Sequence, residues 1–333
     1  MVFQRFFDLA ASVGPLGVTC TALRSILLGG PWDFVRPLLG TREDRPEACA
    51  VNFFEPMRVG AASLLFFMGA CQSPGPTDTP EPFVPTTPSA SSTTSDFELQ
   101  GTWAVERVVA LEVKNLDTYH LFTDPEDEWF TQQTHFYSIA QGQVAEDGTL
   151  SLVESICQMD VSVVGGLDTL PGPGLIDALP PMAYSGHWDA AAQKLSTLPY
   201  ADIWGAKLAE PLIDPLPQGP GEPGVWDQDE DGHPGVTIIL YVVERDLVFG
   251  TIYVAQRVTF TLEGWPVGSD RFEGWVGVQA AEQVLLGAEE AYLGGAEPEV
   301  KPVMDQTLSY FEAERLPPGS GCEHWAGQAS VAF

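Results

Sequence analysis

The C-terminal third of this 333-residue chain contains three long runs in which apolar and polar residues alternate. Val236–Glu244, Val248–Glu263 and Arg271–Leu286 are rich in Val, Ile, Tyr, Phe and Thr, the residue types that strands favour. Short turns at Arg245–Asp246 and Trp265–Asp270 separate the runs. Because strands joined by short turns pair antiparallel, this stretch predicts an antiparallel meander.

Further strands are expected on both sides of this region. They are Gly101–Val113, His135–Val144, Thr149–Met159, Asp202–Leu208 and Leu308–Arg315. Ala145–Gly148 predicts a tight turn, Gly165–Pro181 a long loop, and Pro211–Gly224 a proline-rich segment that wraps the surface. The chain as a whole therefore predicts an all-β fold, an antiparallel meander of about eight or nine strands that forms a barrel or a sandwich.

An export signal is indicated upstream of these strands. Arg58 precedes the apolar run Val59–Phe67, and Met68–Cys71 reads M-G-A-C. This pattern resembles the lipobox of bacterial lipoproteins, although Met68 stands where Leu is usual. The resemblance implies a signal peptide over residues 57–70 that is cleaved before Cys71, whose thiol is then lipidated and anchors the protein in the membrane. Gln72 at the next position implies sorting to the bacterial outer membrane. The alternative, a transmembrane helix, would need a longer apolar run to span a bilayer.

The signal peptide sets the expected domain boundaries. Since such a signal is N-terminal, Met57 is the expected start, and residues 1–56 are interpreted as a non-native extension that is poorly ordered. Residues 71–96 are dense in Pro, Ser and Thr, and this composition predicts a disordered tether. The β-rich domain is expected over residues 97–333.

The charge distribution excludes one class of partner. The formal charge of −31 lies entirely after residue 70, where nine Lys and Arg face 40 Asp and Glu. A domain this acidic repels phosphate backbones, so binding to nucleic acid is not expected.

An acidic loop precedes the first of the long strands. Asp227, Asp229 and Asp231 alternate along it, and Gly232 and His233 follow. The spacing resembles the calcium loops of EF-hands, dockerins and thrombospondin-type repeats, which implies a structural calcium ion held by the three carboxylates and the His233 carbonyl. The loop departs from the EF-hand at Ile238, where that family has Glu; water, Glu230 or Glu244 would complete the shell. The alternative is an acidic turn with local hydrogen bonds and no ion.

Two cysteines remain in the expected domain. Cys157 and Cys322 form an even pair in a chain with an export signal, which predicts a disulfide between them. Two separate buried thiols are the alternative.

The first expected strand begins with Gly101-Thr-Trp103. This G-x-W is similar to the lipocalin signature, in which the Trp closes one end of the barrel and an Arg packs on it. Arg257 and Arg315 are the two arginines that fit this role. The alternative is a buried Trp at the start of an ordinary sheet.

No enzyme motif is present. The sequence contains no HExxH, G-x-S-x-G, Walker loop or G-x-G-x-x-G, and its five histidines lack the spacing of a zinc site. The leading hypothesis is a non-enzymatic, lipid-anchored envelope lipoprotein whose β-domain is stabilised by calcium and by the Cys157–Cys322 disulfide, with a small apolar ligand or an envelope protein as the candidate partner. The combination of lipobox, tether and D-x-D-x-D-G-H-P-G loop resembles lipoproteins of proteobacteria of the myxobacterial type, a resemblance that supplies no activity. One alternative is a lipocalin-like carrier of a small apolar ligand, and another is an extracellular polymer hydrolase.

Overall fold

A computed structural model describes residues 80, 82–86, 97–116, 129–164, 167–242 and 247–326. All of them belong to a compact unit that covers residues 78–333. The predicted extension (residues 1–56), the signal peptide (57–70) and Cys71 lie outside the described residues.

The described residues form twelve strands with three short helical turns. The strands are β1 (Gly101–Lys114), β2 (Trp129–Val144), β3 (Thr149–Val161), β4 (Leu167–Pro171), β5 (Met182–Asp189), β6 (Lys194–Thr197), β7 (Tyr200–Trp204), β8 (Val236–Val242), β9 (Leu247–Pro266), β10 (Arg271–Ala288), β11 (Val300–Pro302) and β12 (Tyr310–Leu316). The helical turns are α1 (Leu175–Ala178), η2 (Gln306–Leu308) and η3 (Cys322–His324).

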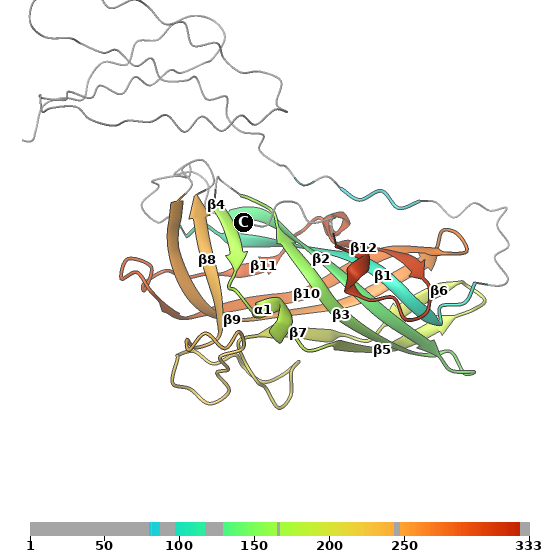
Figure 1. Ribbon diagram of the computed structural model, residues 1–333, viewed down its shortest axis with the longest axis horizontal. Coiled ribbons are helices and arrows are strands. Elements are labelled where there is room, and N and C mark those ends of the chain that lie inside the picture. The colour runs from blue at the N-terminus through green and yellow to red at the C-terminus, as the bar shows by residue number, and fades with distance from the viewer. Residues whose placement is uncertain are drawn as a thin grey trace, which may run out of the picture. The chain divides into compact units, whose positions relative to one another are not determined.

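Eight of the strands close into a ring (Figure 1). Around the ring they follow chain order, β1, β2, β3, β5, β6, β9, β10 and β12, after which β12 pairs with β1 again. Every pairing in the sheet is antiparallel. The prediction of an all-β antiparallel meander is therefore confirmed.

Four further strands lie off this ring, and the long strand β9 carries three of them, β7, β8 and, through β8, β4. One edge of β9 pairs with β10, and the other edge pairs in turn with β8, β7 and β6. Strand β8 then pairs with β4, and β11 pairs with the end of β1. The wall between β3 and β8 is thus made by β4, which hydrogen-bonds to β8.

The region predicted as a long loop differs from the prediction. Gly165–Pro181 contains β4 and α1, and the unpredicted strands β5 and β6 follow it. These strands are short, and Gly186 weakens the strand signal of β5. A Cβ atom at Gly186 would lie 2.3 Å from the backbone oxygen of Ser196, so the close approach of β6 requires a glycine there.

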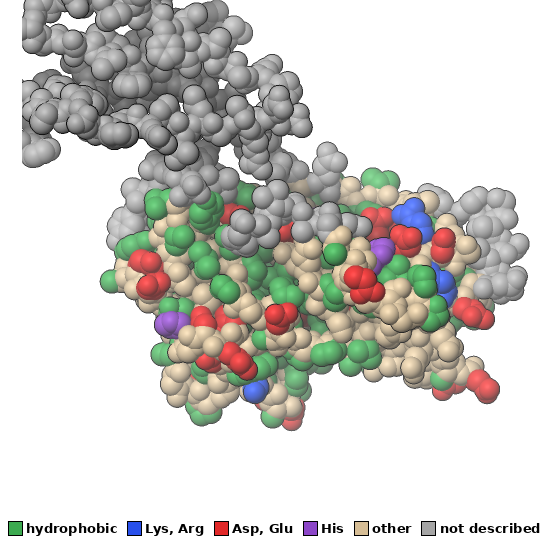
Figure 2. Space-filling model, in the orientation of Figure 1, with side chains coloured by type: hydrophobic (Ala, Val, Ile, Leu, Met, Phe, Trp, Pro, Cys, Tyr) green, Lys and Arg blue, Asp and Glu red, His purple; other side chains and the backbone are tan. Residues whose placement is uncertain are grey.

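The interior of the ring is lined by alternate residues of each strand. In β1 these are Trp103, Val105, Arg107, Val109 and Leu111. All are apolar except Arg107, whose side chain is fully buried. Figure 2 shows one outer face, with hydrophobic side chains visible between the β4–β8 pair and β2–β3, and acidic side chains more numerous than basic ones.

The proline-rich segment Pro211–Gly224 lies on the surface, as predicted, and its Leu216 packs with Ala255 on the outside of β9. Arg257 holds it there, because its Nη1 donates to the carbonyl oxygens of Pro211 (2.8 Å) and Asp214 (2.6 Å). The opposite side of the same guanidinium pairs with Glu282 on β10.

Among the described residues no helix is long and apolar enough to cross a membrane.

Candidate functional site

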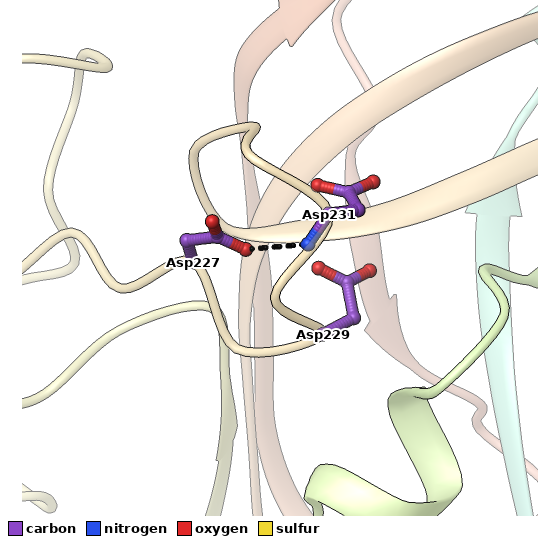
Figure 3. Close-up of side chains that lie close together, drawn as sticks. All are labelled: Asp227, Asp229 and Asp231. Atoms are coloured by element: carbon purple, nitrogen blue, oxygen red, sulfur yellow. Dashed lines mark hydrogen bonds between the residues drawn. The ribbon is translucent and has the colours of Figure 1, made fainter.

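The acidic loop brings its three aspartates together (Figure 3). Each of Asp227, Asp229 and Asp231 offers a carboxylate oxygen, and these oxygens lie within 4.8 Å of one another. Asp227 also accepts hydrogen bonds from the backbone nitrogens of Asp231 (3.2 Å) and Gly232 (3.0 Å), which close the turn. Gly232 has a φ of +90°, a conformation that glycine adopts without strain. The three carboxylates therefore lie together, an arrangement that fits both the predicted calcium site and the alternative of an acidic turn with local hydrogen bonds.

Asp229 is the buried member of this cluster. Its Oδ2 accepts from the backbone nitrogen of Thr237 (2.8 Å), while its buried Oδ1 has no hydrogen-bond partner. Burial raises the pKa of Asp229, the hydrogen bond from Thr237 opposes this rise, and the charges of Asp231 and Asp227 add to it. A buried carboxylate oxygen that faces two like charges without a donor is the environment that a hard divalent cation would neutralise.

Two further positions of the loop are His233 and Ile238. The ring of His233 stacks on Tyr253 with 4.2 Å between centroids, while the predicted calcium ligand is its backbone carbonyl oxygen. Ile238, at the position of the EF-hand Glu, lines the interior of the ring. Thr237 occupies the space beside the carboxylates instead, and its hydroxyl donates to Asp231.

A cavity of about 120 Å³ lies inside the ring. Its wall is mostly apolar and comes from β1, β2, β3, β4, β7, β8, β9, β10 and β11. Representative lining residues are Val109, Phe136, Met159, Leu240 and Val258. The interior is thus incompletely filled by side chains at the end where β4 and β8 complete the wall.

Arg107 forms part of the floor of this cavity and belongs to a buried polar cluster whose members Glu154 and Tyr184 line a second, smaller cavity. Arg107 is 1% exposed, and its Nε lies 3.3 Å from Glu154 Oε1. The hydroxyls of Tyr184 (2.7 Å) and Ser138 (2.9 Å) also donate to Glu154, so that carboxylate is well satisfied. The guanidinium carbon of Arg107 lies 4.3 Å from the centroid of the Phe136 ring. Phe136, on β2, is the residue that pairs directly with Arg107 on β1. The cluster is called the Arg107 cluster below.

The Arg107 cluster retains unused hydrogen-bonding capacity. Arg107 Nη1 is buried and has no hydrogen-bond partner. Asp202, on β7, lines the cavity and accepts from the indole nitrogen of Trp204 at 3.0 Å. Burial raises the pKa of Asp202, although the charge of Arg107 and the bond from Trp204 oppose the rise. The cavity therefore combines apolar walls with a cationic donor and a carboxyl group whose proton is held more tightly than usual.

Sequence reasoning did not find the Arg107 cluster, although a signal for it was present. Arg107 interrupts the inward-facing apolar series of β1 in the same register as Val105 and Val109. A single Arg on the buried face of an alternating strand has to be paired. The identity of its ion-pair partner, Glu154, depends on how the strands are placed in the ring.

Trp103 lies at the other end of the interior. It is buried, its indole nitrogen donates to the carbonyl of Leu99 (2.9 Å), and it lines a second, smaller cavity of about 50 Å³. Of Arg257 and Arg315, the two arginines considered from the sequence, Arg315 packs over Trp103, with its guanidinium carbon 4.4 Å from the ring centroid.

Cys157 and Cys322 form a disulfide, as predicted. Cys157 is the additional residue of a bulge in β3, because Tyr137 pairs with Gln158 and Ser138 with Ile156. Its side chain packs with Trp325, whose indole nitrogen donates to the carbonyl of Ser138. The bond fastens the C-terminal segment to the outside of the ring.

No protein-family model, curated protein or solved structure matches this chain. Its chemistry is therefore inferred from the cavity, the Arg107 cluster and the acidic loop themselves.

Proposed function

We propose that this protein is a non-enzymatic binding protein whose β-domain takes a small, largely apolar molecule inside the ring. The cavity beside the Arg107 cluster is the observation that carries this proposal, since a fully packed interior would leave no room for a ligand. Interior cavities with apolar walls and few polar groups are the usual form of small-molecule sites.

The size of the cavity restricts the ligand. At about 120 Å³ it is close to the ~150 Å³ of an engineered apolar cavity that binds benzene. The expected ligand is therefore about the size of one substituted aromatic ring.

The polar groups at the floor of the cavity restrict the polarity of the ligand. Arg107 keeps one buried donor without a partner, and a ligand that carries a hydrogen-bond acceptor or a carboxylate would supply that partner. Glu154 already receives three donors, so the ligand has no need to satisfy it. A weakly polar aromatic acid or ketone fits both requirements.

A thermal-shift experiment on the full chain tests this proposal. Benzoate and toluene at ten times their dissociation constants should each raise the free energy of unfolding by about 1.4 kcal/mol, with benzoate effective at the lower concentration. Leu240→Trp, which fills the cavity, should abolish both shifts. Ile213→Trp, on an exposed side chain, is the matched control and should keep them. Equal shifts in the two variants, or none in the native protein, would contradict the proposal.

The polymer hydrolase alternative has less support. Glu154 is buried beside Arg107, and Asp202 is half-buried in the wall of a cavity of about 120 Å³, which is too small to hold a polymer chain. A small cavity suits a small ligand better than an extended substrate.

The acidic loop is proposed to bind one Ca²⁺ ion in a structural role. Asp227, Asp229 and Asp231 would hold it with the carbonyl of His233, and the buried Oδ1 of Asp229 supports this assignment. The ion would tie the loop to the start of β8 through Asp229 and Thr237.

Calcium binding is tested by thermal melts in Ca²⁺ and in EDTA. The melting temperature should rise with Ca²⁺ in the native protein and stay constant in Asp229→Asn, which keeps an acceptor for the Thr237 nitrogen. Asp147→Asn, in a turn away from the loop, should respond as the native protein does. A Ca²⁺-independent melt would reduce the loop to a polar turn.

The lipid anchor at Cys71 is also part of the proposal, and the lipobox pattern of residues 68–71 supports it. Anchoring would place the β-domain at the bacterial outer membrane. Metabolic labelling with palmitate should be lost in Cys71→Ser and kept in Cys49→Ser. Label retained in Cys71→Ser would remove the anchor from the proposal.

A further inference from the structure

Part of the Pro/Ser/Thr-rich segment before the domain lies against the outside of the ring. Phe83 stacks on Tyr310 with ring centroids 4.3 Å apart and planes 5° apart, and it meets Trp275 edge-on at 5.4 Å. Trp275 and Tyr310 are paired directly across β10 and β12. The two strands therefore hold the rings of Trp275 and Tyr310 side by side, and the ring of Phe83 packs against both.

Hydrogen bonds fix the same segment on both sides of this contact. The backbone nitrogen of Phe83 donates to the carbonyl of Thr307 in η2 at 3.0 Å. Thr86 donates to both oxygens of Glu273, from its backbone nitrogen (2.9 Å) and from its hydroxyl (3.1 Å). The segment is thus held by two backbone donors as well as by an aromatic ring.

Glu273 is a buried carboxylate that needs hydrogen-bond donors. It is 2% exposed although it lies on the outer face of β10, and it is paired across the strands with Glu312. Arg271 contacts both carboxylates at 3.2 Å and neutralises only one charge of the two. Since a buried carboxylate without enough donors is costly, Thr86 supplies what Arg271 leaves unmet.

The sequence of the segment suits an extended conformation. Pro82 and Pro85 flank the contact and favour the polyproline II conformation, in which side chains point in different directions along the chain. Phe83 and Pro85 are partly buried, whereas Val84 is 83% exposed. Aromatic pairs on a protein surface recognise proline-rich segments in this way because such segments lose little conformational entropy on binding.

We propose that Glu273, Trp275, Tyr310 and the Thr307 carbonyl form a docking site for an extended Pro-Phe-x-Pro-Thr segment, and that residues 82–86 of the same chain are its occupant. The folded domain then begins at about residue 82, and the segment acts as a clip that joins the start of the domain to β10 and β12. This assignment is independent of the proposed ligand, of calcium and of the lipid anchor.

Amide hydrogen exchange on the full chain tests the clip, because the two prolines leave three amides in the segment. Phe83 and Thr86 donate hydrogen bonds, and Val84 has none among the described residues. Phe83 and Thr86 should exchange on the order of 10- to 100-fold more slowly than their intrinsic rates, and Val84 near its intrinsic rate.

A pair of neighbouring substitutions supplies the control. Phe83→Ala removes the stacked ring and should return the amide of Thr86 to near its intrinsic rate. Val84→Ala removes an exposed side chain of the same segment and should leave Thr86 protected. The amide of Val108, in the buried centre of β1, should be unchanged in both variants and shows that the ring is intact. Unprotected Phe83 and Thr86 in the native protein, or protection that survives Phe83→Ala, would overturn the proposal.

Discussion

The guanidinium of Arg315 lies 4.4 Å from the centroid of the Trp103 ring and closes one end of the ring of strands. Its Nη1 and Nη2 donate to the carbonyls of Gln100 and Glu98, so one side chain joins β12 to the chain that enters β1. Trp103 in turn donates to the carbonyl of Leu99. The first turn of the domain is therefore fixed by two side chains that satisfy three backbone carbonyls.

Replacing Arg315 by Lys should lower the free energy of unfolding by about 1–2 kcal/mol. A single ammonium group cannot serve both carbonyls and stack on Trp103 at the same time. Urea unfolding measures the change. Lys194→Ala, which breaks an exposed ion pair with Glu263, is the control and should cost less than about 0.5 kcal/mol. Equal effects in the two variants would contradict the role assigned to Arg315.

Arg107→Met should destabilise the protein by about 3–5 kcal/mol, because it leaves the buried carboxylate of Glu154 without its cation. The double variant Arg107→Met with Glu154→Gln should recover part of this loss, since it removes the unpaired charge. A double-mutant cycle in urea gives the coupling energy. Additive effects of the two substitutions would show that the pair is not coupled.

Removing the disulfide by Cys157→Ala and Cys322→Ala should cost about 2–5 kcal/mol. The bond closes a loop of 165 residues and thereby restricts the unfolded chain. The hydrogen bond from Trp325 to Ser138 should keep the C-terminal segment partly attached in the reduced protein. Urea unfolding with and without a reductant measures the loss, and peptide mapping without reduction should recover the cross-linked pair.

The free energy of unfolding should fall as the pH rises from about 10 to about 12. Burial raises the pKa of Tyr137, Tyr200 and Tyr310 to about 12, and nearby carboxylates add to the rise. In the unfolded chain these groups lose their protons near pH 10. The folded state therefore binds more protons in this range, so unfolding is favoured as the pH increases. Tyrosinate absorbance and urea midpoints measured in parallel should show the two effects together, and a midpoint that stays constant to pH 12 would contradict the shifts.

Several parts of the fold follow from local pattern. The alternation in β8, β9 and β10 predicted their extents to within a few residues, because a half-buried strand requires the period of two. The turn at Ala145–Gly148 is present, and Gly148 has a φ of +83°. Strands β5 and β6 were missed because they are short and their apolar positions are interrupted by Gly186 and His187.

The candidate sites also include some features that follow from local sequence pattern and others that only the tertiary structure decides. The spacing of Asp227, Asp229 and Asp231 is a local property, so the sequence indicated that their carboxylates meet. The burial of Asp229 depends on contacts with Thr237 and Gly172, which the pattern does not contain. The docking of Phe83 was not predicted, because the composition of its segment indicates disorder while its partners Trp275 and Tyr310 lie about 190 and 230 residues away.

The sequence alone determined the strand periodicity, most of the turns and the acidic loop, and it indicated the pairing of Cys157 with Cys322, because each depends on residues that are close in the chain or few in number. Only the tertiary structure decided how the ring closes between β12 and β1, and that Arg107 pairs with Glu154 inside it. The volume left inside the ring was decided at the same level, since it depends on how side chains from nine strands fill a common interior.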